Sequence, residues 1–249
     1  MGLNLFSEGI EKLDQQVFQH LEGKSGKILT IGTPNPEQIM LARENSDFMS
    51  VLSKMNLLIP DGVGLTLSAK LAGLSIDRVP GRVFVVKMLE RSADNKIPVL
   101  FLGGQSGVAE KAKTQVQLAL PRLPVFALRG PVDSTRSTAE DTRKILDLIK
   151  EFRIKMVFVA FGAPKQEIWI QQHAKELENS GVRCVMTIGG ALDVLAGEVL
   201  QPPVFMSSLG LEWLWRLIKQ PWRLTRQLKL IPFVFYACKE VARARLPLD

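Results

Sequence analysis

The stretch Ile154–Phe161, IKMVFVAF, runs directly into Gly162–Glu167, GAPKQE, and these two segments together decide the fold. The first is apolar at almost every position, which is typical of a strand buried on both faces of a sheet. The glycine and proline of the second end the strand, and polar residues then begin a helical pattern. A buried strand that leads directly into a helix is the repeating unit of a parallel α/β sheet.

The same pattern of a strand followed by a helix recurs along the first 200 residues. The other five strand candidates are Lys27–Gly32, Asn56–Pro60, Ile97–Leu102, Leu123–Leu128 and Arg183–Ile188. Amphipathic stretches lie between them, among them Gly107–Leu118 and Thr138–Phe152. Residues 1–200 are therefore predicted to form an α/β domain, with an open, mostly parallel, Rossmann-like sheet and helices on both faces.

Pro202 and Pro203 end this pattern, and residues 201–249 are predicted to form a C-terminal helical appendage. Two helices are expected in it, over Leu209–Lys219 and Trp222–Leu230. Both combine Trp and Leu residues with interleaved Arg and Lys. This composition is typical of a helix that lies on a membrane surface.

The appendage also carries most of the net charge of the chain. Between Ser207 and the C-terminus, eight Lys and Arg stand against three acids, which gives +5 out of a total of +7. A basic segment of this kind indicates an anionic partner, which is phosphate, nucleic acid or acidic lipid.

Cysteine content and hydropathy bear on the cellular compartment. The two cysteines, Cys184 and Cys238, lie far apart, which fits a reducing compartment and not a disulfide scaffold. Cys184 falls in a strand-like run and is interpreted as a buried structural thiol. The longest apolar run, Leu230–Cys238, is far shorter than the ~20 residues of a membrane-spanning helix. We therefore expect a cytoplasmic protein that is soluble or lies on a membrane without crossing it.

The carboxyl ends of the predicted strands are the expected ligand site, because open parallel sheets bind ligands there. Loops rich in glycine and polar residues follow the strands, and bare N–H groups at helix N-termini suit phosphate. The candidate residues in these loops are Thr33, Asn35, Asp61, Gly103, Gly104, Gln166, Gly189 and Asp193. Each has a structural alternative: Thr33, Asn35 and Asp61 can cap helices, and the glycines and Asp193 can form turns. For Asp61, spacing alone favours the cap.

Several standard motifs are absent from the sequence. There is no G-x-G-x-x-G after a strand, no P-loop and no D-x-D pair that could hold a metal on a diphosphate. With only His20 and His173, a zinc site or a His-based nucleophile relay is not expected. We therefore expect no metal and no cofactor.

Seven segments occur in a fixed order between Lys27 and Leu230: TPNPE, PDGVG, RVPG, FLGG, FGAPKQE, GGALDVLAG and LGLEWLWRL. Together they resemble the WecG/TagA/CpsF family of glycosyltransferases. The resemblance implies transfer of N-acetylmannosamine, its uronic acid, glucose or a similar sugar from a UDP-sugar. The implied acceptor is a polyprenyl-diphosphate-linked saccharide in the synthesis of cell-surface polysaccharide or teichoic acid. Inversion at the anomeric carbon and independence of a metal ion are implied as well.

The resemblance also implies roles for single residues. Asp61 matches the general base, Arg78 an arginine near the donor diphosphate, and Asp193 an acid near the nucleoside. The residues that match the lining of the active pocket are Thr33, Asn35 and Gln166. The appendage residues that match arginines folding over the site at the membrane are Arg216, Arg223 and Arg226. The expected partner of the appendage is thus an anionic membrane surface at the inner face of the cell membrane, with no nucleic acid, and a homo-oligomer stays open.

The chain departs from the family pattern at two places, and two other functions are weighed against the transferase. Val83 replaces an acid that the family often has, and the turn Leu128–Pro131 lacks an aromatic residue suited to stacking on uracil. A Rossmann-like oxidoreductase lacks its dinucleotide fingerprint here. A non-catalytic module that binds membranes, RNA or nucleotides through its tail leaves Asp61 and Gln166 without a role.

Overall fold

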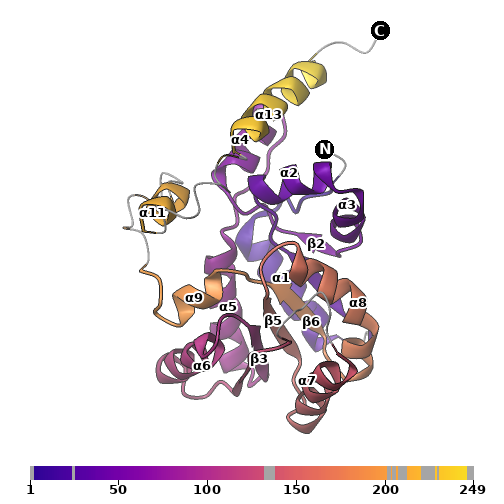
Figure 1. Ribbon diagram of the computed structural model, residues 1–249, viewed down its shortest axis with the longest axis vertical. Coiled ribbons are helices and arrows are strands. Elements are labelled where there is room, and N and C mark those ends of the chain that lie inside the picture. The colour runs from indigo at the N-terminus through magenta and orange to yellow at the C-terminus, as the bar shows by residue number, and fades with distance from the viewer. Residues whose placement is uncertain are drawn as a thin grey trace.

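The computed structural model (Figure 1) describes residues 3–23, 26–131, 138–200, 203, 206, 212–219, 228 and 230–245. Its strands form one open six-stranded sheet in the order β2-β1-β6-β5-β3-β4, and every neighbouring pair is parallel. The strands are β1 (Leu29–Gly32), β2 (Leu57–Leu58), β3 (Val99–Gly103), β4 (Val125–Leu128), β5 (Met156–Ala160) and β6 (Cys184–Thr187). Each overlaps one of the six predicted strands, so the prediction of an open parallel sheet is confirmed.

Helices connect the strands and continue beyond the last one. Those that precede β3 are α1 (Gly9–Glu22), α2 (Pro36–Glu44), α3 (Ser46–Ser53), α4 (Val63–Leu71) and α5 (Gly81–Asp94). Those that follow β3 are α6 (Val108–Ala119), α7 (Ala139–Glu151), α8 (Lys165–Asn179), α9 (Ala191–Leu195), α11 (Glu212–Lys219) and α13 (Leu230–Arg245).

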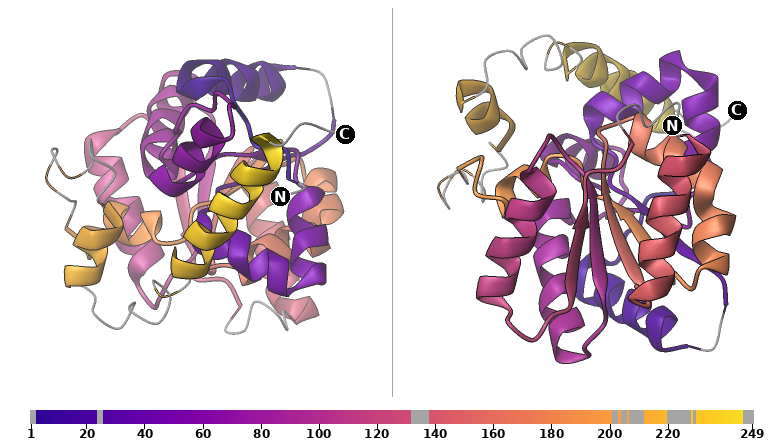
Figure 2. Two further views of the ribbon diagram at one scale, coloured as in Figure 1. Left: turned by 90° about the horizontal axis from the view of Figure 1, so that it is seen from above. Right: turned by 60° about the horizontal axis from the view of Figure 1, so that its bottom comes forward.

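Alternate side chains of each strand enter two separate apolar layers. In β3, Val99 and Phe101 pack into one layer, while Leu100 and Leu102 pack into the other. Residues of α1, α5, α6 and α9 complete the first layer, and residues of α3, α7 and α8 complete the second, so that helices cover both faces (Figure 2). Burial on both faces is the reason why the strands are apolar throughout.

A third apolar cluster joins α13 to α2 and α4 at the end of the molecule shown uppermost in Figure 1. Its buried members are Ile39, Met40, Leu65, Phe233 and Ala237. The sequence prediction missed α13, because it ended the second appendage helix at Leu230, where α13 begins. Pro232 in the first turn of α13 is compatible with this start, since the first N–H groups of a helix have no partner within it.

The rest of the appendage is only partly described. The helix predicted over Leu209–Lys219 is present as α11, of which Glu212–Lys219 are described. Residues 209–211 and 222–227 lie outside the described part of the chain. Trp215 Nε1 donates a hydrogen bond to Leu200 O at 3.0 Å, which links α11 to the segment that follows α9.

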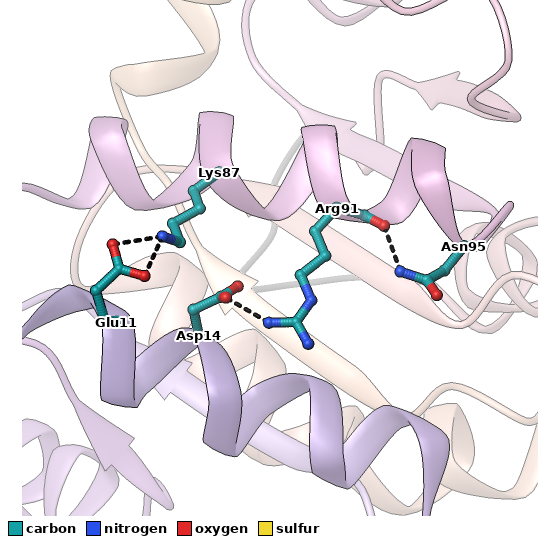
Figure 3. Close-up of polar contacts among 5 residues, drawn as sticks. All are labelled: Glu11, Asp14, Lys87, Arg91 and Asn95. Atoms are coloured by element: carbon teal, nitrogen blue, oxygen red, sulfur yellow. Dashed lines mark hydrogen bonds and ion pairs between the residues drawn. The ribbon is translucent and has the colours of Figure 1, made fainter.

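Two ion pairs connect α1 to α5 on one face of the sheet (Figure 3). Lys87 Nζ lies 2.6 Å from both carboxylate oxygens of Glu11, whose side chain is 76% exposed. Arg91 pairs with Asp14, whose side chain is only 7% exposed, and the Arg91 guanidinium also stacks 4.2 Å from the centre of the Phe18 ring. The buried pair fixes α5 relative to α1, and α5 is the helix whose first residue reaches the candidate site.

We predict that Asp14→Ala lowers the free energy of unfolding by about 1–3 kcal/mol, because it leaves a half-buried guanidinium without its carboxylate. Glu11→Ala is the matched control on the same two helices and should cost less than about 1 kcal/mol, since that pair is exposed. Urea denaturation of both variants measures the difference. Equal losses of unfolding free energy in the two variants would show that the Asp14–Arg91 pair stabilises the fold no more than the exposed pair does.

Candidate active site

A cavity of about 1090 Å³ lies beyond the carboxyl ends of the strands. Its wall is formed by the loops after all six strands, together with residues of α2, α4, α5, α8, α9 and α13. The predicted site residues that line it are Thr33, Asn35, Asp61, Arg78, Gly104, Gln166, Gly189 and Asp193. The fold thus brings together loops that are far apart in the sequence, as expected for an open parallel sheet.

Thr33 ties the end of β1 to the end of β6. Its N–H donates to Thr187 Oγ1 at 3.3 Å, and its own Oγ1 donates to Thr187 O at 3.3 Å. Asn35 caps α2, because its Oδ1 accepts from Gln38 N at 3.0 Å while the Gln38 side chain accepts from Asn35 N at 3.1 Å. The cap alternative is therefore confirmed for Asn35, although this residue also lines the cavity. The buried Thr187 was missed, since a threonine inside a strand pattern gives no signal of a site.

Asp61 lies where β2 ends, between two loops and the start of a helix. Its N–H donates to Pro34 O at 3.1 Å, which holds the loop after β2 against the loop after β1. Its Oδ1 accepts from the N–H of Gly81, the first residue of α5, at 3.4 Å. The next helix, α4, is preceded by Gly62 and has no side-chain cap, so the alternative that Asp61 caps it is wrong. The carboxylate of Asp61 instead lies at the positive end of the α5 dipole.

Two glycines in this region are required by close approach of other atoms. A Cβ on Gly81 would lie 3.2 Å from Thr33 Cγ2 and 3.7 Å from Asp61 Oδ2, so glycine lets α5 begin against both side chains. Gly103 has a φ of +113° and a Cβ there would lie 2.8 Å from Ala160 O. A glycine is therefore needed at this position because the chain packs closely against the end of β5. Unlike Gly104, Gly103 is not among the described residues that line the cavity.

Gln166 and Glu167 are both buried in the first turn of α8. Gln166 lines the cavity, and its Nε2 donates to Glu167 Oε1 at 2.9 Å. Burial raises the pKa of Glu167 from 4.5 to about 7, opposed by hydrogen bonds from Gln166 and from its own backbone. The burial of Glu167 could not be expected from the sequence, since an acid is ordinarily exposed.

Basic side chains surround the polar part of the cavity. Besides Arg78, the wall contains Arg82, Arg129 and Lys165, none of which had been predicted as a site residue. The described acids of the wall are Glu37, Asp61 and Asp193. A cluster of four cations is suited to a ligand with two phosphate groups. Arg78 and Arg129 come from two loops, whereas Arg82 and Lys165 lie in the first turns of α5 and α8, so spacing in the sequence did not reveal it.

Phe161 supplies an aromatic side chain to the wall, next to the turn Leu128–Pro131, which has none of its own. It lines the cavity, and a Cβ on Gly130 would lie 2.7 Å from its ring. The ring also makes an edge contact with Trp169 at 5.5 Å between centroids. The prediction had considered only the turn Leu128–Pro131, whereas the aromatic residue comes from the end of β5.

Three predicted residues cannot be placed in this geometry. Arg216 belongs to α11, but its side chain is outside the described structure, and Arg223 and Arg226 lie outside the described residues. Their predicted role over the site stays a prediction.

Metal ligation, membrane spanning and thiol chemistry were also compared with the described residues. Within them, no three His, Cys, Asp or Glu side chains are placed to share a metal ion. None of the described helices has the length and hydropathy needed to cross a membrane. Burial raises the pKa of the Cys184 thiol to about 12, which agrees with its interpretation as a structural residue.

Replacing Glu167 by glutamine should change how stability depends on pH. The carboxyl binds its proton more tightly in the folded protein than in the unfolded chain, so its contribution is largest below about pH 4.5 and is lost as the pH rises to about 7. The free energy of unfolding of Glu167→Gln minus that of the wild type should therefore rise by about 3 kcal/mol between pH 4.5 and 8. Urea denaturation at both pH values measures this difference, and a difference independent of pH would contradict it.

Comparison with known proteins agrees with this geometry. The model of the glycosyl transferase WecG/TagA/CpsF family matches residues 3–247. Among curated proteins, the chain is similar to an N-acetylglucosaminyldiphosphoundecaprenol N-acetyl-beta-D-mannosaminyltransferase of Staphylococcus aureus strain MW2. The two are 26% identical over 246 residues, which cover 98% of this chain and 92% of the relative. Proteins of the same name from strains NCTC 8325 and MRSA252 match with the same identity and coverage.

The family match extends over nearly the whole chain, and it includes each loop that forms the cavity. The expectation of an enzyme that transfers a sugar, drawn from seven short segments, is confirmed by it. This chain belongs to the WecG/TagA/CpsF family of glycosyl transferases.

Proposed function

We propose that this enzyme transfers N-acetylmannosamine or a closely similar sugar from a UDP-sugar to N-acetylglucosamine carried on a polyprenyl diphosphate. The observation that carries the proposal is the cavity itself, in which a carboxylate, a cluster of basic side chains and an apolar wall occur together. The relatives from Staphylococcus aureus, whose name describes this reaction, support the choice of sugar and acceptor. We place the reaction in cell-surface polysaccharide or teichoic acid synthesis, at the inner face of the cell membrane.

The proposed chemistry is a single displacement with inversion at the anomeric carbon. An acceptor hydroxyl oxygen attacks that carbon from the side opposite the diphosphate, and the bond to the diphosphate oxygen breaks with its electron pair going to UDP. Asp61 accepts the proton of the attacking hydroxyl, which is the role of a general base. Its contact with Gly81 at the start of α5 supports this role, because the hydrogen bond holds the carboxylate in the wall of the cavity.

The leaving UDP gains negative charge, and the described cations of the wall are suited to receive it. Arg82 and Lys165 lie in the first turns of α5 and α8, and Arg78 and Arg129 lie in loops of the same wall, so their charges need little rearrangement as the bond breaks. This arrangement supports transfer without a metal ion. We assign Thr33, Asn35, Gly104, Gln166 and Gly189 to the walls that position the substrates, and Asp193 to the nucleoside side.

The segment 201–249 is proposed to hold the enzyme on an anionic membrane. Its net positive charge and the exposed Phe235 of α13, which is not among the described residues that line the cavity, support an amphipathic surface helix. We also propose that Arg216, Arg223 and Arg226 close over the diphosphate when this segment meets the membrane. In this proposal, residues 1–200 form the α/β domain and residues 201–249 form the appendage.

Neither alternative function agrees as well with these observations. Membership in a glycosyl transferase family argues against an oxidoreductase, which had no cofactor fingerprint in the sequence. A non-catalytic membrane module would explain the basic appendage. It would not explain why Asp61, Gln166 and the basic cluster line one cavity.

We expect Asp61→Asn to lower turnover roughly a hundredfold or more, because the amide cannot take the proton of the attacking hydroxyl. Binding of UDP should persist, since the cationic wall is unchanged. Steady-state transfer from UDP-N-acetylmannosamine and calorimetric titration with UDP measure the two effects. Asp193→Asn is the matched control and should raise the KM for the donor with little loss of turnover. Near-normal turnover of Asp61→Asn would leave Asp61 as a structural residue at the start of α5.

Chelators should leave transfer unchanged within a factor of about two, because side-chain cations and helix termini can stabilise the leaving diphosphate. Activity in EDTA, compared with activity after addition of magnesium or manganese, checks this expectation. Complete loss in EDTA that is restored by either metal would contradict the metal-independent mechanism.

A further inference from the structure

Two neighbouring helices give the cavity an apolar wall that the proposed chemistry does not use. Leu67 and Leu71 of α4 line the cavity, and their side chains are 53% and 47% exposed. Ile231 and Val234 of α13 line it as well, and they are 69% and 58% exposed. Large apolar side chains gathered in this way on a soluble domain mark a binding surface more often than an ordinary exterior.

This wall is held in place by the buried cluster beneath it. Leu65 of α4 packs against Phe233 of α13, so the two helices lie side by side and turn their other faces to the cavity. Leu67 and Leu71 are four residues apart on one helix, and Ile231 and Val234 are three apart on the other. Each pair therefore occupies a single helical face. Figure 1 shows α4 and α13 together at one end of the molecule.

The wall begins at the proposed catalytic residue and carries almost no charge. Val63, the first residue of α4, is two positions after Asp61. Lys70 is the only ionisable residue of α4, and the segment Leu230–Cys238 of α13 has no charged residue. A phosphate or a sugar would find no ionic partner along this surface, whereas a hydrocarbon chain would cover the exposed leucine, isoleucine and valine side chains.

We propose that the surface formed by Leu67, Leu71, Ile231 and Val234 binds the isoprenoid chain of the acceptor, next to its diphosphate. This inference rests on the proposed function, because it assigns the acceptor to the apolar side of the same cavity. The isoprenoid chain runs along the cavity-facing sides of α4 and α13, while the saccharide and diphosphate face Asp61 and the basic cluster. Continuity with the cavity is the reason to assign this surface to the acceptor chain. A second protein copy or a flat bilayer would not need a wall inside the cavity.

The first test needs no turnover. Farnesyl diphosphate and inorganic pyrophosphate are titrated into the full-length chain by calorimetry. Leu71→Asn should weaken binding of farnesyl diphosphate about tenfold, as expected for loss of one buried leucine contact, and should leave binding of pyrophosphate unchanged. Leu67→Asn provides a second variant on the same face. Leu118→Asn on α6 is the matched control, since Leu118 is 72% exposed and is not among the described residues that line the cavity.

The second test uses transfer to N-acetylglucosamine diphosphate esters of undecaprenol and of butanol in detergent. Leu71→Asn should raise the KM for the undecaprenyl ester about tenfold and leave the butyl ester unaffected. Wild-type protein that transfers sugar to neither ester would contradict the proposed function. Wild-type protein that transfers to both, with no selective loss in Leu71→Asn, would overturn the isoprenoid site alone.

Two further measurements separate other occupants of the same surface. If Leu71→Asn shifts the sedimentation velocity of the protein from dimer to monomer, the wall is a contact between copies of the chain and the inference is overturned. If the variant loses binding to anionic vesicles without acceptor but keeps its affinity for farnesyl diphosphate, the wall docks on the bilayer surface and the inference is also overturned. Unchanged mass and unchanged vesicle binding support it.

Discussion

All six strands run in the same direction, and the site depends on this constraint. Parallel strands place their carboxyl ends at one edge of the sheet, so the loops that follow all six strands meet there. The central strands are apolar on both sides because helices cover both faces. Polar side chains are therefore concentrated in the loops and in the first turns of the helices that follow, and these segments line the cavity.

The precision of the site depends on α5, which links the interior to the cavity. At its far end the buried pair of Arg91 and Asp14 fixes α5 to α1. At its near end Gly81 donates to Asp61 and leaves room for Thr33. A shift of α5 would move the N–H group that holds the proposed base. The Arg91–Asp14 pair is thus connected to the proposed base through α5, although neither residue is among the described residues that line the cavity.

The wall of the cavity combines charged and apolar side chains with the proposed base. Arg78, Arg82, Arg129 and Lys165 are suited to a diphosphate. The apolar residues of α4 and α13 are suited to a lipid chain. An enzyme that joins a water-soluble nucleotide sugar to a lipid-bound acceptor needs both environments within reach of one reacting carbon. Membership in the family shows that the enzyme transfers a sugar. The charged and apolar side chains of the cavity support the mechanism proposed for that transfer.

The sequence by itself determined the six strands, their parallel pairing and the loops that carry the site. These features follow from local patterns. A strand that helices cover on both faces must be apolar throughout, and glycine, proline and polar residues mark the loops. Eight candidate residues from those loops and the segments beside them do line the cavity. Tertiary structure alone decided that Glu167 is buried and that basic side chains from separate segments line one cavity. It also decided the packing role of Gly103 and the position of α13. Each depends on contacts between segments distant in sequence, and local pattern carries no information about such contacts.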